Sequence, residues 1–326
     1  DVVSKTGFVT SRRDALNCAN ARPSPSTINF SNNLSGGTIR LTQGALPVTG
    51  SVNLRGLGAD LLTISGENTS QVFTFGEGTF TVSGLDIANG RSSFNGGAID
   101  AAPGHDLTIR DSVIRNSHAN FAGGGLRSNE GTLTLINSAV VNNTAGFQSG
   151  GIDFFNASNS QIINSTISGN SVTTTSGGGF TNTASSDRSS LVTLTNVTMA
   201  GNTAPSGGSF VTATGSGAIE SRTRYRNSIF TTSDSNIVAR GFTARNESLG
   251  FNISSNGEGN LDAEGDKRNT TPCWVRFRTT VDEHQRMLCY LRVRPLIPEA
   301  THSHSTNLAN ALNSTSEPRA LLASST

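Results

Sequence analysis

The sequence predicts an all-β protein, a right-handed parallel β-helix (solenoid) with a short N-terminal capping helix. Three observations predict this fold. The chain is poor in charged and aromatic residues, a unit of 26 to 32 residues recurs along it, and apolar residues alternate with polar ones in short strands.

The composition favours a thin fold. Of 326 residues, 14% are charged and 6% aromatic, while 36 are glycine, so there is little material for a thick core. A solenoid needs little, because each coil buries only a narrow apolar strip against its neighbours. Regularly spaced apolar runs also distinguish the chain from a disordered one.

The repeating unit pairs a Gly-rich turn and a short strand with a second strand that ends on Asn-Ser or Asn-Val. This closing marker begins at Asp111, Asn137, Asn164, Asn196 and Asn227, in steps of 26, 27, 32 and 31 residues. Longer steps contain extra turn residues, as insertions in repeat proteins map to loops. The clearest units are GGAIDAAPGHDLTIRDSVIRNS (96–117), GGGLRSNEGTLTLINSAVVNNT (123–144), GGIDFFNASNSQIINSTISGNS (150–171) and GGGFTNTASSDRSSLVTLTNVTMAGNT (177–203).

Within a unit, alternation such as Leu107-Thr-Ile109 and Leu133-Thr-Leu135 turns one face inward and polar Thr outward. Coils stacked at about 4.8 Å would pair the backbone with the coils above and below. Parallel crossovers of this kind are right-handed. The marker asparagines would form a ladder in one turn, because Asn tolerates left-handed backbone geometry.

The ends of the solenoid are predicted from the positions at which the repeat pattern starts and stops. Residues 36–66 and 72–90 continue it upstream as the first coils. Before them, Ala15, Leu16 and Ala19 have helical spacing with Ser11 as an N-cap, so residues 11–22 are expected to form a helix that covers the open end. The predicted organisation is an N-terminal segment with the cap (1–26), a β-helix (27–265) and an atypical tail (266–326).

Charge and cysteine content exclude several classes of protein. A net charge of +1 gives no field to attract polyanions, so nucleic acid is not an expected partner. Cys18, Cys273 and Cys289 are too scattered for a zinc motif or a disulfide framework, although Cys273 and Cys289 could pair. No apolar stretch has transmembrane length, and the start at Asp1 indicates a mature or trimmed product.

The chain resembles a family of exported bacterial β-helix proteins related to polymorphic outer-membrane and choice-of-anchor proteins. The matching features are SRRDALNCAN at 11–20, GADLLTISG at 58–66 and the repeated Gly-rich coils, which together cover roughly residues 8–265. Arg12 departs from the family's usual Leu. The resemblance implies an extracellular or bacterial cell-surface location, and it carries no catalytic residues, because family members are mostly uncharacterised.

The last sixty residues differ from the rest. From Asp266 onward there is no Gly, and Trp274, two of the three Cys and three of the five His occur here. Plausible codons for residues 278–291 and 314–318, when read in a neighbouring frame, would encode segments similar to those near the family's usual C-terminus. We hypothesise a frame-shifted tail from about residue 270, which sequencing the gene would test.

One constellation of outward side chains suggests chemistry. Asp100, Arg127, Asp153 and Thr181 follow equivalent Gly turns and should form one outward column. Such a column could bind a sugar or an acidic polysaccharide. The two carboxylates, roughly 9 to 10 Å apart over two coils, would suit an inverting glycoside hydrolase or a lyase. The alternative is that the alternating charges only stabilise register through cross-strand pairs.

Other residues have weaker indications. Phe121, Phe147 and Phe155 could form a platform on which sugars stack, or they could pack in the core and turns. His105 and His118 are expected at the surface. The cluster of Arg222, Arg224, Arg226 and Arg245 is read as a solvated basic face.

The expected function is therefore a secreted or cell-surface β-helix that presents a repetitive face to a polysaccharide, surface glycan or other surface, without catalysis. A carbohydrate-active enzyme using Asp100, Arg127 and Asp153 is the alternative, and an ester hydrolase is a distant one. No cofactor or metal site is expected, although Asp and Asn ladders in turns could offer oxygen ligands to Ca²⁺.

Overall fold

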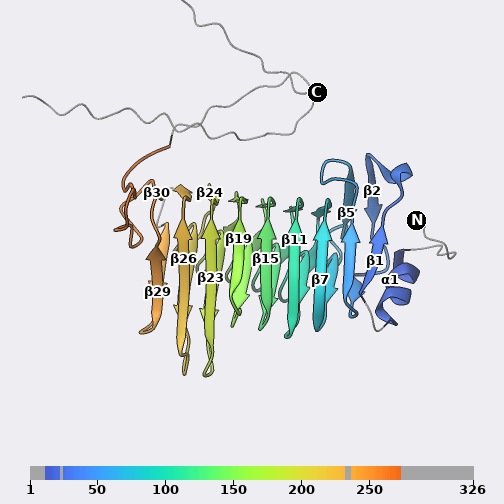
Figure 1. The fold of residues 1–326 in the computed structure, drawn as a ribbon, viewed down its shortest axis with the longest axis horizontal. Coiled ribbons are helices and arrows are strands. Elements are labelled where there is room, and N and C mark those ends of the chain that lie inside the picture. The colour runs from blue at the N-terminus through green and yellow to red at the C-terminus, as the bar shows by residue number, and fades with distance from the viewer. Residues whose placement is uncertain (1–11, 23–24, 232–235, 273–326) are drawn as a thin grey trace, which may run out of the picture. The chain divides into compact units, whose positions relative to one another are not determined.

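The computed structural model shows a right-handed parallel β-helix of about eight coils, with one α-helix near its N-terminus (Figure 1). It describes residues 12–22, 25–231 and 236–272. The chain divides into two units at Pro272 and Cys273, and only the first contains described residues. The predicted fold class is confirmed, whereas Ser11, the Cys273–Cys289 pairing and the proposed frame-shifted tail from Cys273 onward lie outside the described residues.

Every coil passes through parallel sheets I and II and most continue into sheet III, and in four coils a short strand of sheet IV lies between sheets II and III. Sheet I, one of the two nine-stranded sheets, is turned toward the viewer in Figure 1. Its strands are β1 (Ser26–Asn29), β4 (Val52–Arg55), β7 (Gly78–Ser83), β11 (His105–Arg110), β15 (Thr132–Ile136), β19 (Ser160–Ile163), β23 (Ser189–Thr195), β26 (Glu220–Arg226) and β29 (Ala244–Ser248).

Sheet II follows sheet I in every coil. Its strands are β2 (Gly37–Arg40), β5 (Leu62–Ser65), β8 (Asp86–Ala88), β12 (Val113–Arg115), β16 (Ala139–Val141), β20 (Thr166–Ser168), β24 (Thr198–Ala200), β27 (Ile229–Thr231) and β30 (Ile253–Ser254). A short 3₁₀ helix, η1 (Asn32–Leu34), precedes β2.

Sheets III and IV close the coil. Sheet III contains β3 (Leu46–Val48), β6 (Phe73–Phe75), β10 (Ile99–Ala101), β14 (Leu126–Asn129), β18 (Ile152–Phe155), β22 (Phe180–Ala184), β25 (Phe210–Thr214) and β28 (Ile237–Arg240). Sheet IV contains the two-residue strands β9 (Arg91–Ser92), β13 (His118–Ala119), β17 (Thr144–Ala145) and β21 (Ser171–Val172).

In-register stacking produces the core, because equivalent inward residues lie directly above one another. In sheet I the column Val82, Ile109, Leu135, Ile162 and Leu194 is fully buried, as the alternation of the sequence predicts. Each such side chain is removed from water by its neighbours, which contributes roughly 1.5 to 3 kcal/mol per large aliphatic residue. One large core cluster therefore runs along the solenoid, and Ala145, Val172 and Ala204 form a second, small cluster.

The marker residues of the repeat occupy the predicted left-handed turn. Asp111, Asn137, Asn164, Asn196 and Asn227 have φ between 48° and 56°. The amide of Asn196 donates to the side-chain oxygen of Asn164 at 2.9 Å, so part of the predicted exposed ladder is formed. Asn is suited to this position because its side chain tolerates the left-handed region better than most others.

The predicted cap is also present. Helix α1 (Arg12–Asn20) contacts β1 and β3 and buries Ala15, Leu16 and Ala19. Asn20 fixes the C-terminal end of the helix, since its Oδ1 accepts hydrogen bonds from the backbone of Thr49 and Gly50. The helix thereby covers the apolar interior at the first coil.

Strand pairing continues to the end of the described chain. Ile253 forms a bridge with Lys267, and the carboxylate of Asp266 accepts a hydrogen bond from the backbone of Asn252 at 2.8 Å. Residues just beyond the predicted boundary at 265 thus still pack on the last coil.

Candidate functional site

The predicted column lies on the outer side of sheet III. Asp100 is in register with Arg127, Arg127 with Asp153, and Asp153 with Thr181. The structure therefore brings the four residues together on consecutive strands, as the repeat alignment predicts.

Asp153 is nevertheless not open to solvent. Only 2% of the residue is exposed, because the preceding Gly-type turn folds back over it. Its Oδ1 accepts hydrogen bonds from Ser149 and Thr181, both at 2.9 Å, and from Gln148 at 3.4 Å. Its Oδ2 lies 3.5 Å from Nε of Arg127. The expectation of an outward, accessible carboxylate is thus wrong for Asp153, whose oxygens are already occupied.

Ser149 explains this closure. In the neighbouring coils the equivalent turn positions are glycines, Gly96, Gly123, Gly177 and Gly207, all with positive φ, and Ser149 adopts the same geometry with φ 60°. A non-glycine residue in this region costs roughly 1 to 2 kcal/mol. The hydrogen bond that its fully buried hydroxyl donates to Asp153 offsets that cost. The substitution of Ser for Gly was visible in the sequence, and sequence reasoning missed it.

The electrostatics of the column follow from burial. Burial raises the pKa of Asp153 above its ordinary value, while Arg127 and the three hydrogen bonds act in the opposite direction. Burial also raises the pKa of Asp100, which Arg127 lowers and Asp153 raises further. Asp100 is only half-buried. The arrangement offers one accessible carboxyl group and one enclosed carboxyl group, which a substrate cannot reach without opening the turn.

Each of the predicted platform phenylalanines, Phe121, Phe147 and Phe155, has a partner on at least one ring face. Phe121 is stacked between Phe94 and Phe147, with ring centroids 5.3 and 4.8 Å away and interplanar angles of 14° and 11°. Both faces of its ring are therefore covered. Phe155 carries the guanidinium of Arg127 over its ring at 5.7 Å. Sugars stack on ring faces, and those of Phe121 are occupied by its neighbours.

The two histidines behave differently from each other. His105 is 2% exposed, and its ring nitrogens lie 2.7 Å from the carbonyl oxygen of Ala102 and 2.9 Å from Oγ of Ser128. It is a buried structural residue, so the expectation of a surface position is wrong. His118 is half-buried and bonds to Thr144 and Asn120.

The face that remains open is the outer side of sheet I. One column of uncharged polar residues runs along seven successive strands, in register at every step. None of these seven side chains has a hydrogen-bond partner within the described residues. We call it the polar column: Thr27, Asn53, Thr81, Thr108, Thr134, Gln161 and Thr193.

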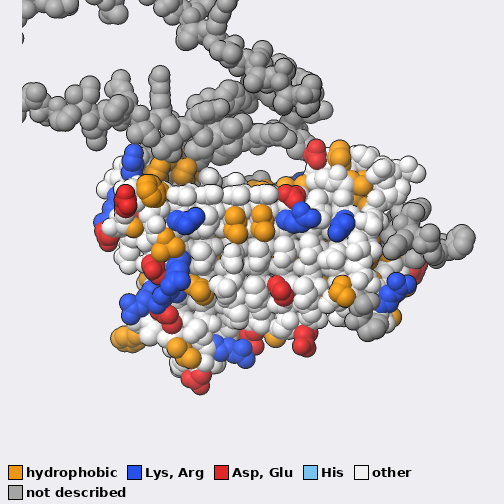
Figure 2. All heavy atoms as spheres, in the orientation of Figure 1, with side chains coloured by type: hydrophobic (Ala, Val, Ile, Leu, Met, Phe, Trp, Pro, Cys, Tyr) orange, Lys and Arg blue, Asp and Glu red, His pale blue; other side chains and the backbone are white. Residues whose placement is uncertain are grey.

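Figure 2 shows this face. Over the middle strands most side chains are neither charged nor hydrophobic, and charged side chains gather over β26 and β29 at one end. Parallel strands place successive side chains of the polar column about 4.8 Å apart. The result is a row of hydroxyl and amide groups with free hydrogen-bonding capacity and a fixed repeat.

The basic cluster of the sequence is partly neutralised. Arg222 lies 2.7 Å from Glu220, Arg224 lies 2.9 Å from Glu247, and Arg245 lies 3.4 Å from Glu220. Three of the four arginines are thus paired, and the expected purely basic face is a mixed one. Comparison of the repeats did not identify Glu220 and Glu247 as partners of the arginines, because the repeating unit is irregular in these coils.

Within the residues that the structure covers, no group of three His, Cys, Asp or Glu side chains is placed to hold a metal ion. None of the described helices is both long and apolar enough to span a bilayer. Comparisons with protein families, with curated protein sequences and with solved structures found no match to the chain.

Proposed function

We propose that this β-helix is a non-catalytic binding protein, whose sheet I face presents the polar column to an extended glycan or a glycan-coated surface. The observation that carries the proposal is that seven consecutive in-register side chains are uncharged, at least partly exposed and without a hydrogen-bond partner among the described residues. A glycan is a repeating chain of hydroxyl groups, which both donate and accept hydrogen bonds as these side chains do. Many weak contacts along one rigid row act together, because after the first contact the others form within one complex.

The proposal is non-catalytic because the enzyme alternative requires two reachable carboxylates. Asp153 is enclosed by Ser149, Thr181 and Gln148, whereas the polar column needs no rearrangement to meet a ligand. We further propose export to the cell surface, which rests on the resemblance of residues 11–20 and 58–66 to exported bacterial β-helix proteins.

Binding to insoluble cellulose and to soluble polygalacturonate tests the proposal. The double variant Thr108→Glu/Thr134→Glu places two charges on adjacent strands of the polar column. The matched control, Thr166→Glu/Thr198→Glu, places two charges on adjacent strands of sheet II at half-buried positions. We expect at least a tenfold loss of binding to one of the polymers in the first variant and little change in the second.

Equal loss in both variants would indicate a general effect of charge or folding and would contradict the proposal. The proposal would also be contradicted if the wild type binds one of the polymers and the Thr108→Glu/Thr134→Glu variant binds it equally well. Absence of binding to either polymer by the folded wild type would likewise count against a glycan-binding face.

A further inference from the structure

A second row of outward side chains lies beside the polar column on sheet I. It occupies the positions two residues after the polar column, toward the C-terminal ends of the strands, and is in register from β1 to β26. In Figure 2, basic and hydrophobic side chains lie in one row across this face. Side chains two residues apart on a strand point to the same face, so a ligand on the polar column also meets this row. We call it the arginine row: Asn29, Arg55, Ser83, Arg110, Ile136, Ile163, Thr195 and Arg226.

Two of the three arginines in the row have no partner among the described residues. Arg55 and Arg226 are exposed, and neither forms an ion pair or a side-chain hydrogen bond with another described residue. Arg110 lies 3.2 Å from Asp111, in an exposed pair that leaves most of its N–H donors unused. A guanidinium group binds a carboxylate through two parallel hydrogen bonds. The row therefore offers three guanidinium groups to an anionic ligand.

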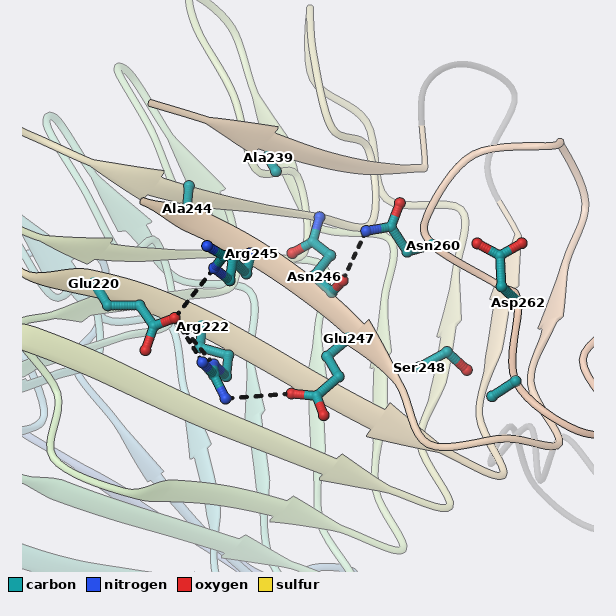
Figure 3. A pocket seen from close by; sticks show the side chains of 11 residues that line it. Glu220, Arg222, Ala239, Ala244, Arg245, Asn246, Glu247, Ser248, Asn260 and Asp262 are labelled. Atoms are coloured by element: carbon teal, nitrogen blue, oxygen red, sulfur yellow. Dashed lines mark hydrogen bonds and ion pairs between the residues drawn. The ribbon is translucent and has the colours of Figure 1, made fainter. Parts of the chain in front are cut away.

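Other arginines on this face are already neutralised by the protein. Figure 3 shows Arg222 between Glu220 and Glu247, with Arg245 also reaching Glu220. Arg226 follows on the same strand as Arg222 and has no such carboxylate among the described residues. The capacity to bind an anion thus lies in the arginine row and not in the denser cluster of charges at the C-terminal end.

Sheet I has a local excess of positive charge. Its strands contain six arginines and three acidic residues, and Asp111 in a following turn adds a fourth acid, which leaves two positive charges. At physiological ionic strength, surface charges act over only about 8 Å. This local excess, and not the net charge of the whole chain, therefore decides which ligand charge the face favours. The residues of the strands are Arg55, Arg110, Arg222, Arg224, Arg226 and Arg245, with Asp106, Glu220 and Glu247.

The arginines of the row recur at even intervals of coils. Arg110 lies two strands from Arg55, and Arg226 lies four strands from Arg110. With strands about 4.8 Å apart, these intervals are about 9.6 and 19 Å. The shorter interval is close to the length of about two sugars in an extended chain. One chain of acidic sugars lying along the row can therefore bring a carboxylate to each arginine.

Two isoleucines between Arg110 and Arg226 favour a sugar chain over a nucleic acid. Ile136 and Ile163 are outward and half-buried, so the C–H face of a sugar ring can pack on them while its carboxylate reaches an arginine. A nucleic-acid backbone carries a charge at every nucleotide. The isoleucines would take water from those phosphates without supplying a partner, which costs free energy.

We propose that the ligand of the sheet I face is an acidic glycan, whose hydroxyl groups bond to the polar column and whose carboxylates bind Arg55, Arg110 and Arg226. This inference rests on the proposed glycan-binding function and adds the charge of the ligand to it. Because salt screens exposed charges, the preference for an acidic chain should weaken as the ionic strength rises.

Calorimetry with the full chain compares polygalacturonate with its fully methyl-esterified form, which keeps the sugar hydroxyls and has no charge. At about 0.02 M salt, we expect the wild type to bind the acidic form at least tenfold more tightly, and this preference to fall severalfold at about 0.3 M salt.

The test variant Arg55→Gln/Arg226→Gln removes the two unpaired arginines of the row. It should lower affinity for the acidic form at least fivefold, leave binding of the esterified form unchanged and keep the wild-type unfolding midpoint. The matched control, Arg91→Gln/Arg240→Gln, removes two exposed arginines on sheets IV and III that also have no partner among the described residues. It should bind both forms as the wild type does.

The inference is overturned if the two forms bind the wild type equally, if the test variant binds the acidic form as the wild type does, or if test and control variants lose the same affinity. Tighter binding of oligothymidylate than of polygalacturonate would also overturn it. Equal binding of both forms, combined with loss in Thr108→Glu/Thr134→Glu, would reject the acidic ligand and leave the glycan-binding proposal standing. If neither form nor cellulose binds the wild type, both proposals fail.

Discussion

Replacing Asn170 with alanine should test how the interior of the solenoid is held in register. Asn143, Asn170 and Asn202 lie above one another inside consecutive coils and are at most 1% exposed. The Oδ1 of Asn170 accepts from the backbone N–H of Asn143 at 2.9 Å and from its side-chain amide at 3.0 Å. Its own amide donates to Asn202 and to the carbonyl of Val140.

The magnitude follows from what alanine leaves behind. The backbone N–H of Asn143 loses its acceptor in a buried position, which costs about 1 to 3 kcal/mol, and three further hydrogen bonds of about 1 kcal/mol each disappear. We therefore expect the free energy of unfolding to fall by about 4 to 6 kcal/mol, measured by urea unfolding followed by circular dichroism.

The matched control is Asn164→Gly, which removes an exposed ladder residue and keeps the left-handed turn, since glycine adopts positive φ without strain. It should cost about 1 kcal/mol or less. If Asn170→Ala and Asn164→Gly shift the urea midpoint equally, the interior ladder does not hold the coils together as argued.

Three other outcomes are expected. Burial lowers the pKa of His105, so the folded state favours the neutral imidazole. The contribution of His105 to the free energy of unfolding is therefore fully present above its unfolded pKa of about 6.5, and it is lost as the pH falls below that value. His105→Gln should remove this part of the decline in unfolding free energy between pH 7.5 and 5, and an unchanged decline would contradict the assignment. Gly124→Ala places a Cβ 2.3 Å from two carbonyl oxygens and should abolish soluble folded protein. The control Gly201→Ala has φ +60° and no atom within 4 Å of the new Cβ, so it should lower the unfolding free energy by only about 1 to 2 kcal/mol, measured by thermal unfolding. Similar costs for the two variants would argue against close stacking at the Gly turns. Asp153→Ala should destabilise by about 3 to 5 kcal/mol because it leaves Arg127 and three donors without their acceptor, while Asp100→Ala should cost about 1 kcal/mol or less; the reverse order in a thermal melt would refute the structural role of Asp153.

The fold was predictable because most of its determinants are local and repeated. Leu107-Thr-Ile109 and its counterparts show the inward and outward faces directly, and Asn137, Asn164 and their counterparts mark the left-handed turn in five coils. The interior ladder of Asn143 and Asn170 was less visible, because a second asparagine beside the exposed Asn142 reads as one more turn residue. Its burial depends on the path of the chain after the turn, which sequence alone does not give.

The site was only partly predictable. The register of Asp100, Arg127 and Asp153 follows from counting residues after each Gly turn, so their adjacency could be foreseen. The burial of Asp153 could not, because it depends on how the turn at Ser149 folds back. The ion pairs that Arg222, Arg224 and Arg245 form with Glu220 and Glu247 were also beyond reach, since the repeat is irregular in these coils.

Threonine methyl NMR during a glycan titration tests the central claim most directly, because threonines occur on each outer face. With cellulose-derived or polygalacturonate-derived oligomers, we predict that Thr81, Thr108, Thr134 and Thr193 of the polar column shift together and saturate at one concentration. Shifts confined to Thr181 and Thr183 beside Asp153, with the polar column unmoved, would contradict the account.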